Sequence, residues 1–263
     1  MKASEWLKTV PAAPGAARDK MFLDAIYAGD VVVDWCTVVM GPIELRVSTD
    51  VLQVGEPGDS VRINVSANSQ QKIADWFGCV LPTAKICDAI YDQAKYKLGI
   101  HNLPPDNLMA HTFRMVKHSQ LIDDELNKQG CVGLGDLRAD CGKDWVLTKK
   151  LENVWKTKPQ QSCNYGWHNT SSGEARADGK PGKVIQGCGY MHNWSHSDYS
   201  QNCRLIYNVC NVNGQEQSLT EAYKDTILSK ILCHDGALTL GRMLGVPYED
   251  PQQKLLDMIK NSQ

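Results

Sequence analysis

The segment "VVVDWCTVVMGPIELRVS", residues 31–48, decides the fold class because it reads as two β-strands joined by a turn. Valine, isoleucine, threonine and tryptophan favour strands, and the Gly-Pro pair at 41–42 supplies turn residues between the two apolar runs. Further along, residues 60–66 alternate between apolar and polar side chains, as a half-buried strand does. The first quarter of the chain is therefore expected to contain β-structure.

Helices are predicted after this β-rich part. Thr83 is placed to cap a helix over 82–99, which Gly99 would end. Ser218 and Glu221 form a Ser-x-x-Glu capping box at the start of a helix over 218–233. Apolar spacing predicts the remaining helices over 20–29, 69–78, 107–130 and 250–263.

A second β-rich stretch is expected over 131–212, with strands at 144–149, 162–168, 183–188 and 203–212. The order of strands, helices, strands and helices lacks the regular alternation of a doubly wound sheet. We therefore predict an α+β fold, with a mixed or antiparallel sheet and packed helices in a single large domain. The domain organisation is a Pro/Ala-rich N-terminal arm over 1–18 and one domain over 19–263, with a subdivision near 131 that separates a helix-rich part (67–130), a strand-rich part (131–212) and C-terminal helices (218–263).

Composition places the chain among soluble globular proteins, because 42% of its 263 residues are hydrophobic and 22% are charged. The formal net charge is −2 and the basic residues are scattered, so we expect no nucleic-acid partner. Without an apolar run of about 18 residues, no membrane insertion is expected. The first 20 residues lack the apolar core of a signal peptide, which predicts synthesis in the cytoplasm followed by virion association or release by lysis.

The ten cysteines contain no Cys-x-x-Cys pair and are irregularly spaced. Such spacing disfavours zinc-ribbon and redox-motif interpretations, and without a secretion signal most cysteines are expected to be reduced and buried. A cysteine nucleophile remains an alternative, with Cys163, Cys188 or Cys203 near the histidines.

Residues that can take part in catalysis are most concentrated in the segment "YMHNWSHSDYSQNCRLI", residues 190–206. In an extended conformation, His192, His196, Asp198 and Ser200 would share one face, because even intervals separate them. Imidazole and carboxylate together can form an oriented general base, and a nearby hydroxyl can act as a nucleophile. The alternative is a polar turn whose side chains satisfy the local backbone.

Two further segments add candidates to this stretch. "CNYGWH" ends in Trp167 and His168, and the Lys143-Asp144 pair lies at the edge of an expected strand. Lys143 would either form a surface ion pair with Asp144 or bind the substrate as a clamp. No cofactor is predicted, but a divalent metal is an alternative, with the ligands His168, His192, His196 and Asp198.

The motifs "GKDWVLT" (142–148), "YGWH" (165–168) and "DYSQNCRLI" (198–206) resemble a family of bacterial and phage proteins that has no established activity. Its pattern contains Gly-Lys-Lys-Asp-Val, Tyr-Gly-Trp-His, and His followed by Asp-Tyr-Ser-His-Gly-x-Arg, and the similarity spans roughly residues 43 to 210. The matching residues are Lys143, Asp144, His168, His192, Asp198, Tyr199, Ser200 and Arg204. Gln201 and Asn202 stand where the family has His and Gly, so Gln201 cannot act as a proton shuttle in place of that histidine.

Together, the clustered residues and the resemblance favour a phage-encoded hydrolase acting on a cell-envelope polymer, either peptidoglycan or a surface glycan. His192 would be the general base, oriented by Asp198, and either Ser200 or a water molecule would attack the substrate. The catalytic set is His192, Asp198, Ser200 and His168, and the substrate-binding set is Lys143, Asp144, Tyr199, Arg204 and Trp167.

Two non-catalytic alternatives remain open: a virion-associated structural protein with a degenerate hydrolase-like domain, and a glycan-binding module. The expected partners are accordingly an envelope polymer or virion proteins. Formation of a homo-oligomer is left open.

Overall fold

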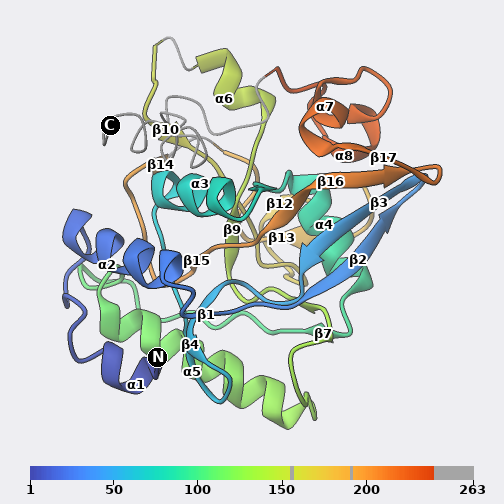
Figure 1. Cartoon of the computed structure of the whole chain (residues 1–263). Coiled ribbons are helices and arrows are strands. Elements are labelled where there is room, and N and C mark those ends of the chain that lie inside the picture. The colour runs from blue at the N-terminus through green and yellow to red at the C-terminus, as the bar shows by residue number, and fades with distance from the viewer. Residues whose placement is uncertain (155–156, 190–191, 240–263) are drawn as a thin grey trace, which may run out of the picture.

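The largest sheet of the computed structural model contains the predicted hairpin. The structure describes residues 1–154, 157–189 and 192–239. Strands β2 (Trp35–Met40) and β3 (Ile43–Ser48) pair in register around the turn at Gly41, which has a φ of 60°. The sheet has the antiparallel order β17-β16-β3-β2, with β16 (Ile206–Val212) beside β3 and β17 (Gln215–Ser218) at one edge (Figure 1). The short strand β6 (Cys79–Val80) also pairs with β16.

Helices α3 (Ala67–Trp76) and α4 (Ala84–Gln93) follow, as predicted. Thr83 caps α4, since its Oγ1 accepts a hydrogen bond of 3.3 Å from the Ile86 N–H. The helix is shorter than expected and ends before Gly99, because the backbone becomes extended at Ala94. The chain then forms β7 (Tyr96–Lys97), which pairs in parallel with β8 (Arg138–Ala139).

A second group of elements surrounds the N-terminus in Figure 1. Helices α1 (Ala3–Trp6), α2 (Ala16–Tyr27) and α5 (Thr112–Lys128) lie near a three-stranded antiparallel sheet of order β1-β4-β5. Its strands are β1 (Val31–Val32), β4 (Gln53–Glu56) and β5 (Asp59–Arg62). Residues 1–18, expected as an arm, contribute the buried side chains of Ala3, Trp6 and Val10 to the main core.

A small central sheet connects segments that are far apart in sequence. Its order is β11-β9-β15, with β9 (Lys143–Trp145) antiparallel to β11 (Asn164–Gly166) and parallel to β15 (Gln201–Asn202). Next to it, β10 (Gln161–Ser162) pairs with β14 (His192–Asn193). Helix α6 (Lys149–Val154) and the hairpin of β12 (Glu174–Ala175) and β13 (Lys183–Val184) complete this part.

The helix predicted over 218–233 is two short helices, α7 (Leu219–Lys224) and α8 (Ser229–Leu232). The capping box is confirmed, because Ser218 Oγ accepts from the Glu221 N–H. The helix breaks at Asp225, whose backbone is extended and whose carboxylate accepts from the N–H groups of Ile227 and Leu228. The helix predicted over 250–263 lies outside the described residues.

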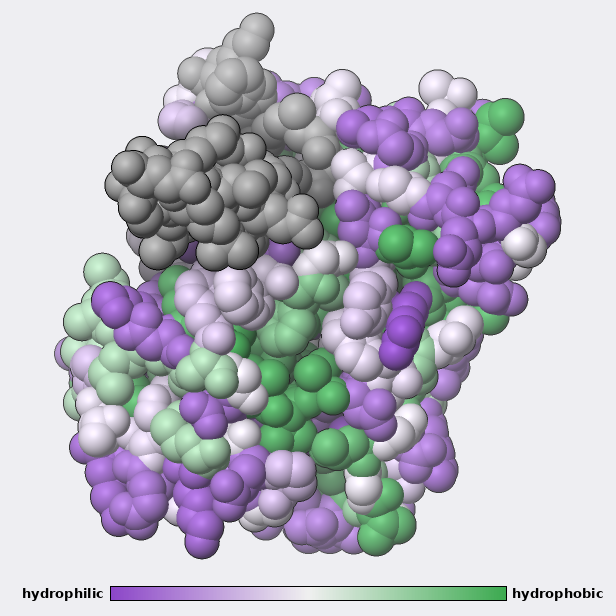
Figure 2. Space-filling model, in the orientation of Figure 1, coloured by the Kyte–Doolittle hydropathy of each residue, from purple (hydrophilic) through white to green (hydrophobic). Residues whose placement is uncertain are grey.

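The predicted α+β class is confirmed, with mostly antiparallel pairs and two parallel ones. One apolar core extends from α1 to α8 and is continuous across residue 131, while a smaller cluster lies beneath α5. Figure 2 shows apolar residues gathered in the middle of one face and polar residues along its rim. None of the helices in the described ranges combines the length and the hydropathy needed to span a bilayer.

Candidate functional site

Strand β9 lies at the centre of the residues singled out by sequence. Lys143 and Asp144 are consecutive in this strand, so their side chains point to opposite faces of the β11-β9-β15 sheet. Gly142, just before the strand, allows β9 and β15 to approach each other. A Cβ atom there would lie 2.0 Å from Nδ2 of Asn202, and the φ of +156° is one that other residues rarely adopt.

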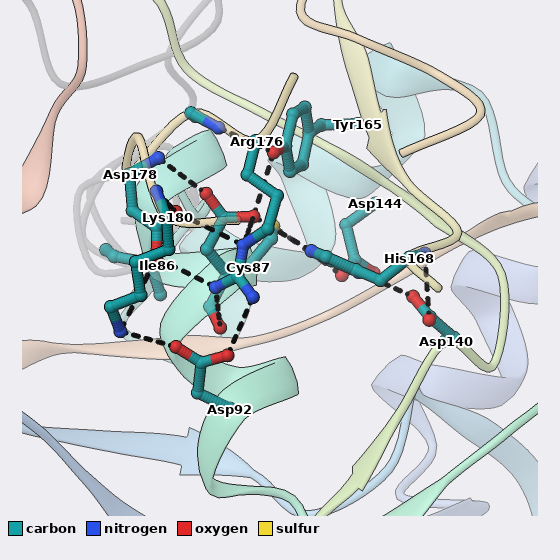
Figure 3. Close-up of polar contacts among 12 residues, drawn as sticks. Ile86, Cys87, Asp92, Asp140, Asp144, Tyr165, His168, Arg176, Asp178 and Lys180 are labelled. Carbon is teal, nitrogen blue, oxygen red and sulfur yellow. Dashed lines mark hydrogen bonds and ion pairs between the residues drawn. The ribbon is translucent and has the colours of Figure 1, made fainter. Parts of the chain in front are cut away.

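On the Asp144 side lies a set of charged and polar side chains that we call the Asp88 network: Asp88, Asp140, Tyr165, His168, Arg176 and Asp178. All are buried except Asp178, which is partly buried, and Figure 3 labels all of them except Asp88. His168 Nδ1 is 2.8 Å from Asp140 Oδ1, and its Nε2 is 2.8 Å from Asp88 Oδ1. The imidazole also stacks on Tyr91, with the ring centroids 4.3 Å apart. Both ring nitrogens of His168 are therefore occupied by carboxylates.

Asp88 is fully buried and accepts two more hydrogen bonds, from the Tyr165 hydroxyl and the Asp178 N–H, each at 2.8 Å. Arg176 lies beside it, with Nε 3.7 Å from Asp88 Oδ1, and reaches Asp92 and Asp178 with its other nitrogens (Figure 3). A buried carboxylate is stable only when it is paired and hydrogen-bonded in this way.

These contacts set the protonation of His168. Burial lowers its pKa, but the hydrogen bonds and charges of Asp140 and Asp88 outweigh that effect and raise it to about 9. His168 is therefore an imidazolium at neutral pH, with both protons donated to carboxylates. Such a group cannot accept a proton from a substrate or water, which argues against the predicted catalytic role of His168.

The backbone explains why Trp167 and His168 separate. Trp167 and Asn169, on either side of His168, have left-handed φ values of 60° and 56°. With this distortion at the end of β11, Trp167 lies next to Lys143, while His168 turns to the Asp88 network.

Asp144 and Arg204, two of the predicted substrate ligands, belong to the core. Burial raises the pKa of Asp144 to about 6, although the charge of Arg204 opposes the shift. Arg204 is 1% exposed and donates to the carbonyls of Ser48, at 2.7 Å, and Arg138, at 3.0 Å. Its guanidinium is therefore out of reach of a substrate carboxylate or phosphate, and it instead ties β8 and β3 to the segment before β16.

On the opposite side of β9 lies the Asp198 cluster, which consists of Lys143, Trp167, His192, His196, Asp198 and Ser200. Lys143 Nζ lies 5.1 Å from the centre of the Trp167 ring. The rings of His192 and His196 are stacked, 4.9 Å apart and 8° from parallel. His196 Nε2 in turn lies 3.7 Å from Asp198 Oδ2.

The stretch that carries this cluster is not extended. Between β14 and β15 it forms turns, so the single shared face predicted from the even spacing is wrong. The side chains meet through the Asp198 turn instead, where Ser200 donates to Asp198 Oδ1 from its hydroxyl at 2.5 Å and from its N–H at 2.8 Å. The polar-turn alternative describes this local geometry.

Gln201 has a defined position in that turn. Its Oε1 accepts a 2.8 Å hydrogen bond from the Asp198 N–H, and its side chain is fully buried. The residue that departs from the family pattern thus fixes the backbone of the Asp198 turn.

The charges of the Asp198 cluster are balanced. Burial would raise the pKa of Asp198, but the nearby His196, the charge of Lys143 and the hydrogen bonds from Ser200 hold it well below its usual range. The pKa of His192 is lowered by its partial burial and by the neighbouring His196 and Lys143. His192 is therefore neutral at pH 7, and no hydrogen bond from the described residues occupies its ring.

Beside His192, the Lys143 side of the sheet carries amide groups without partners. The strand register places Asn164, Gln201 and Lys143 on this face. Within the described ranges, neither amide atom of the buried Asn164 has a hydrogen-bond partner, nor has Nε2 of Gln201. Buried polar atoms of this kind require water or a ligand.

The sequence favours a packed or surface helix position for His118, and the structure buries it in α5, with its ring 5.2 Å from that of Tyr199. Burial, followed by the neighbouring His101 and Arg62, lowers its pKa to about 3. Tyr199, one of the predicted substrate ligands, is itself buried, and its hydroxyl accepts from the Leu103 N–H at 2.9 Å. The sequence does not point to Asp88 or Asp140; an acidic residue within the apolar run "ICDAI" (86–90) is the only signal for the first.

The four residues of the metal hypothesis are not brought together, because His168 lies on the Asp88 side of β9 and the other three on the Asp198 side. Across the described ranges, no three His, Cys, Asp or Glu side chains are placed to hold a metal ion.

Comparison with protein-family models, curated proteins and solved structures found no match for the chain. The resemblance to the bacterial and phage family therefore stays a prediction, and only the geometry of the site can support a function.

Proposed function

We propose that the protein is a hydrolase in which His192 acts as the general base toward a water molecule. The observation that carries this proposal is a neutral, partly exposed imidazole whose ring is free of hydrogen bonds from the described residues, next to a lysine and an ionised aspartate. A base with a pKa below 7 is in its acceptor form at neutral pH, which is what proton abstraction from water requires.

Each neighbour has a separate task in this mechanism. His192 takes the proton as the water attacks, and the stacked His196, paired with Asp198, holds the orientation of the His192 ring. Lys143 stabilises the negative charge that develops on the attacked group. Ser200 is 1% exposed and donates its proton to Asp198, so it positions Asp198, and water is the attacking group.

A cell-envelope polymer, whether peptidoglycan or a surface glycan, is the substrate class of this proposal. It is supported by Lys143, a partly buried cation that matches the carboxylates of such polymers.

A direct test is to incubate the purified protein with isolated peptidoglycan and with surface glycans, and to measure the release of soluble fragments. His192→Gln is expected to lower the rate by about 10²–10⁴-fold, which is the usual contribution of a general base. His111→Gln is the matched control, because His111 lies at the start of α5 and outside the Asp198 cluster. Equal release by the wild type and His192→Gln on every polymer would refute the proposal.

A second candidate function is a non-catalytic structural role in a virion. It is favoured by the burial of most motif residues, since Asp144, His168, Tyr199, Ser200 and Arg204 are all less than 10% exposed. Motif residues that serve only to maintain the fold would be buried in the same way. Incorporation of His192→Gln into particles at the wild-type level, together with absent hydrolysis by the wild type, would favour this role. Polymer binding without release would indicate a glycan-binding module.

A further inference from the structure

Two cysteines form a close pair next to the candidate site. Cys163 lies at the junction of β10 and β11, and Cys188 lies 25 positions later, in the loop after β13. Their Sγ atoms are 3.1 Å apart. A disulfide bond is about 2.05 Å long, so an approach of about 1 Å would join the two sulfurs.

The surroundings of the pair distinguish it from the other cysteines. All ten cysteines are free, and burial raises the pKa of most of the buried thiols; for Cys79 and Cys233 it is raised to about 12. For Cys188, the hydrogen bond with Cys163 and the nearby His234 outweigh burial and lower the pKa to about 5. His234 shifts in the opposite direction, because the Cys188 sulfur stabilises its charged form.

The two sulfurs differ in access and in charge. Cys188 is 6% exposed, whereas Cys163 is completely buried and has a pKa raised by burial. Cys188 is thus the sulfur that a small reagent reaches first, with Cys163 directly behind it. A reactive thiolate with a second thiol in contact is the usual arrangement of a reversibly oxidised pair.

We propose that Cys188 and Cys163 are a peroxide-reactive dithiol, with Cys188 as the attacking thiolate and Cys163 as the resolving thiol. The Cys188 sulfur attacks one oxygen of hydrogen peroxide, the O–O bond breaks, and the departing hydroxide takes up a proton to become water. Cys163 then attacks the resulting Cys188 sulfenic acid, forms the Sγ–Sγ bond, and releases a second water molecule. The two thiols lose two electrons, which reduce one peroxide to two waters.

The disulfide would connect the loop that contains Cys188 to the strands on either side of Cys163, which lead to residues of the candidate site. Cys163 follows β10, which pairs with the strand that carries His192, and precedes β11, which leads to Trp167. Cys188 is held in place through its carbonyl, which accepts a 2.6 Å hydrogen bond from Lys150 Nζ. Oxidation would therefore link the loop 185–189 covalently to the strands that position the Asp198 cluster.

The test is to treat the purified full-length protein with an equimolar amount of hydrogen peroxide, alkylate the remaining thiols, and map the peptides by mass spectrometry. We expect a single Cys163–Cys188 cross-link, with the other eight of the ten cysteines alkylated. Because a bridge restricts the unfolded chain, Tm is expected to rise by several degrees and to return to its starting value on reduction.

Cys188→Ser is expected to slow peroxide-dependent thiol loss by at least about tenfold, whereas Cys163→Ser should stop at a sulfenic acid on Cys188. Cys36→Ser, at a partly buried cysteine outside the pair, is the matched control and should behave as the wild type does. The wild-type peptide map decides the question even if a variant fails to fold. Full alkylation of Cys163 and Cys188 after peroxide, or a cross-link between other cysteines, overturns the proposal.

Discussion

His168 and His192 lie on opposite sides of the same strand and meet carboxylates in different ways. His168 is buried between Asp88 and Asp140, each 2.8 Å from a ring nitrogen, and it remains protonated up to a pH of about 9. His192 is partly exposed and reaches Asp198 only through the stacked His196, so its pKa falls instead of rising. At neutral pH one histidine is therefore a cation and the other a neutral base.

The number of carboxylates in direct contact decides whether a buried histidine is charged and whether its ring can accept a proton. Two direct carboxylates stabilise the charged form by more than burial costs it, and they occupy both nitrogens. His192 has no carboxylate in direct contact and lies near a lysine, so burial lowers its pKa and no charge in contact raises it again. One of its ring nitrogens can therefore accept a proton.

The largest effect is expected from removing one carboxylate of the buried site. Asp88→Asn should lower the free energy of unfolding by about 3–5 kcal/mol, because it leaves the buried His168 imidazolium without one of its two partners. Asp92→Asn is the matched control, one turn further along α4, where the partly exposed carboxylate pairs with Arg176 and Lys180. Asp92 is partly exposed although Arg176 is buried, so water can replace part of the lost contacts and a smaller loss than for Asp88→Asn is expected. Urea denaturation measures the loss in the free energy of unfolding for both variants. Equal losses would show that Asp88 stabilises the fold no more than the partly exposed Asp92 does.

A smaller effect is expected in the pH dependence of stability. The pKa of His168 is raised in the folded state from an ordinary 6.5 to about 9. The folded state therefore holds a proton that the unfolded state has lost, and the stabilisation is complete below pH 6.5 and disappears as the pH rises through 9. The difference amounts to about 3 kcal/mol.

His168→Gln should remove this loss between pH 6.5 and 9. The difference between the wild-type and variant denaturation curves isolates His168 from other groups that titrate in the window. A wild-type curve that parallels the variant across the window would contradict the assignment of His168 as a buried imidazolium.

The smallest effect concerns the other histidine. In an NMR titration the His192 ring should titrate below its ordinary pKa of 6.5, because burial, His196 and Lys143 all disfavour its charged form. Lys143→Met removes one of these positive charges, so the pKa of His192 should rise in the variant while that of His168 stays unchanged. If the pKa of His192 falls or stays the same, Lys143 is not part of its surroundings.

Much of the fold could be predicted from sequence because it depends on local signals. The turn at Gly41 and the caps at Thr83 and Ser218 all lie within a few residues of the elements they define. The end of α4 could not be predicted, since it depends on pairing of β7 with β8, some forty residues away along the chain.

The candidate site was only partly predictable. The sequence grouped His192, His196, Asp198 and Ser200, and the structure keeps them close, but through a turn rather than a strand. The role of His168 depends on Asp88 and Asp140, which are 80 and 28 positions away, so no local spacing could reveal it. Likewise, no sequence pattern shows that Arg204 is buried.

The contact between Arg18 and Ser197 has a consequence for biosynthesis. Arg18 of α2 is completely buried and donates to Ser197 Oγ at 3.0 Å, a partner 179 positions later and next to Asp198. At the usual elongation rate of about 5–20 residues per second, the ribosome needs roughly 10–40 s to supply that partner. During this time the Arg18 guanidinium has only part of its final surroundings, such as the Ala110 carbonyl to which it also donates. The contacts of Arg18 are therefore complete only once the segment next to the Asp198 turn has been made.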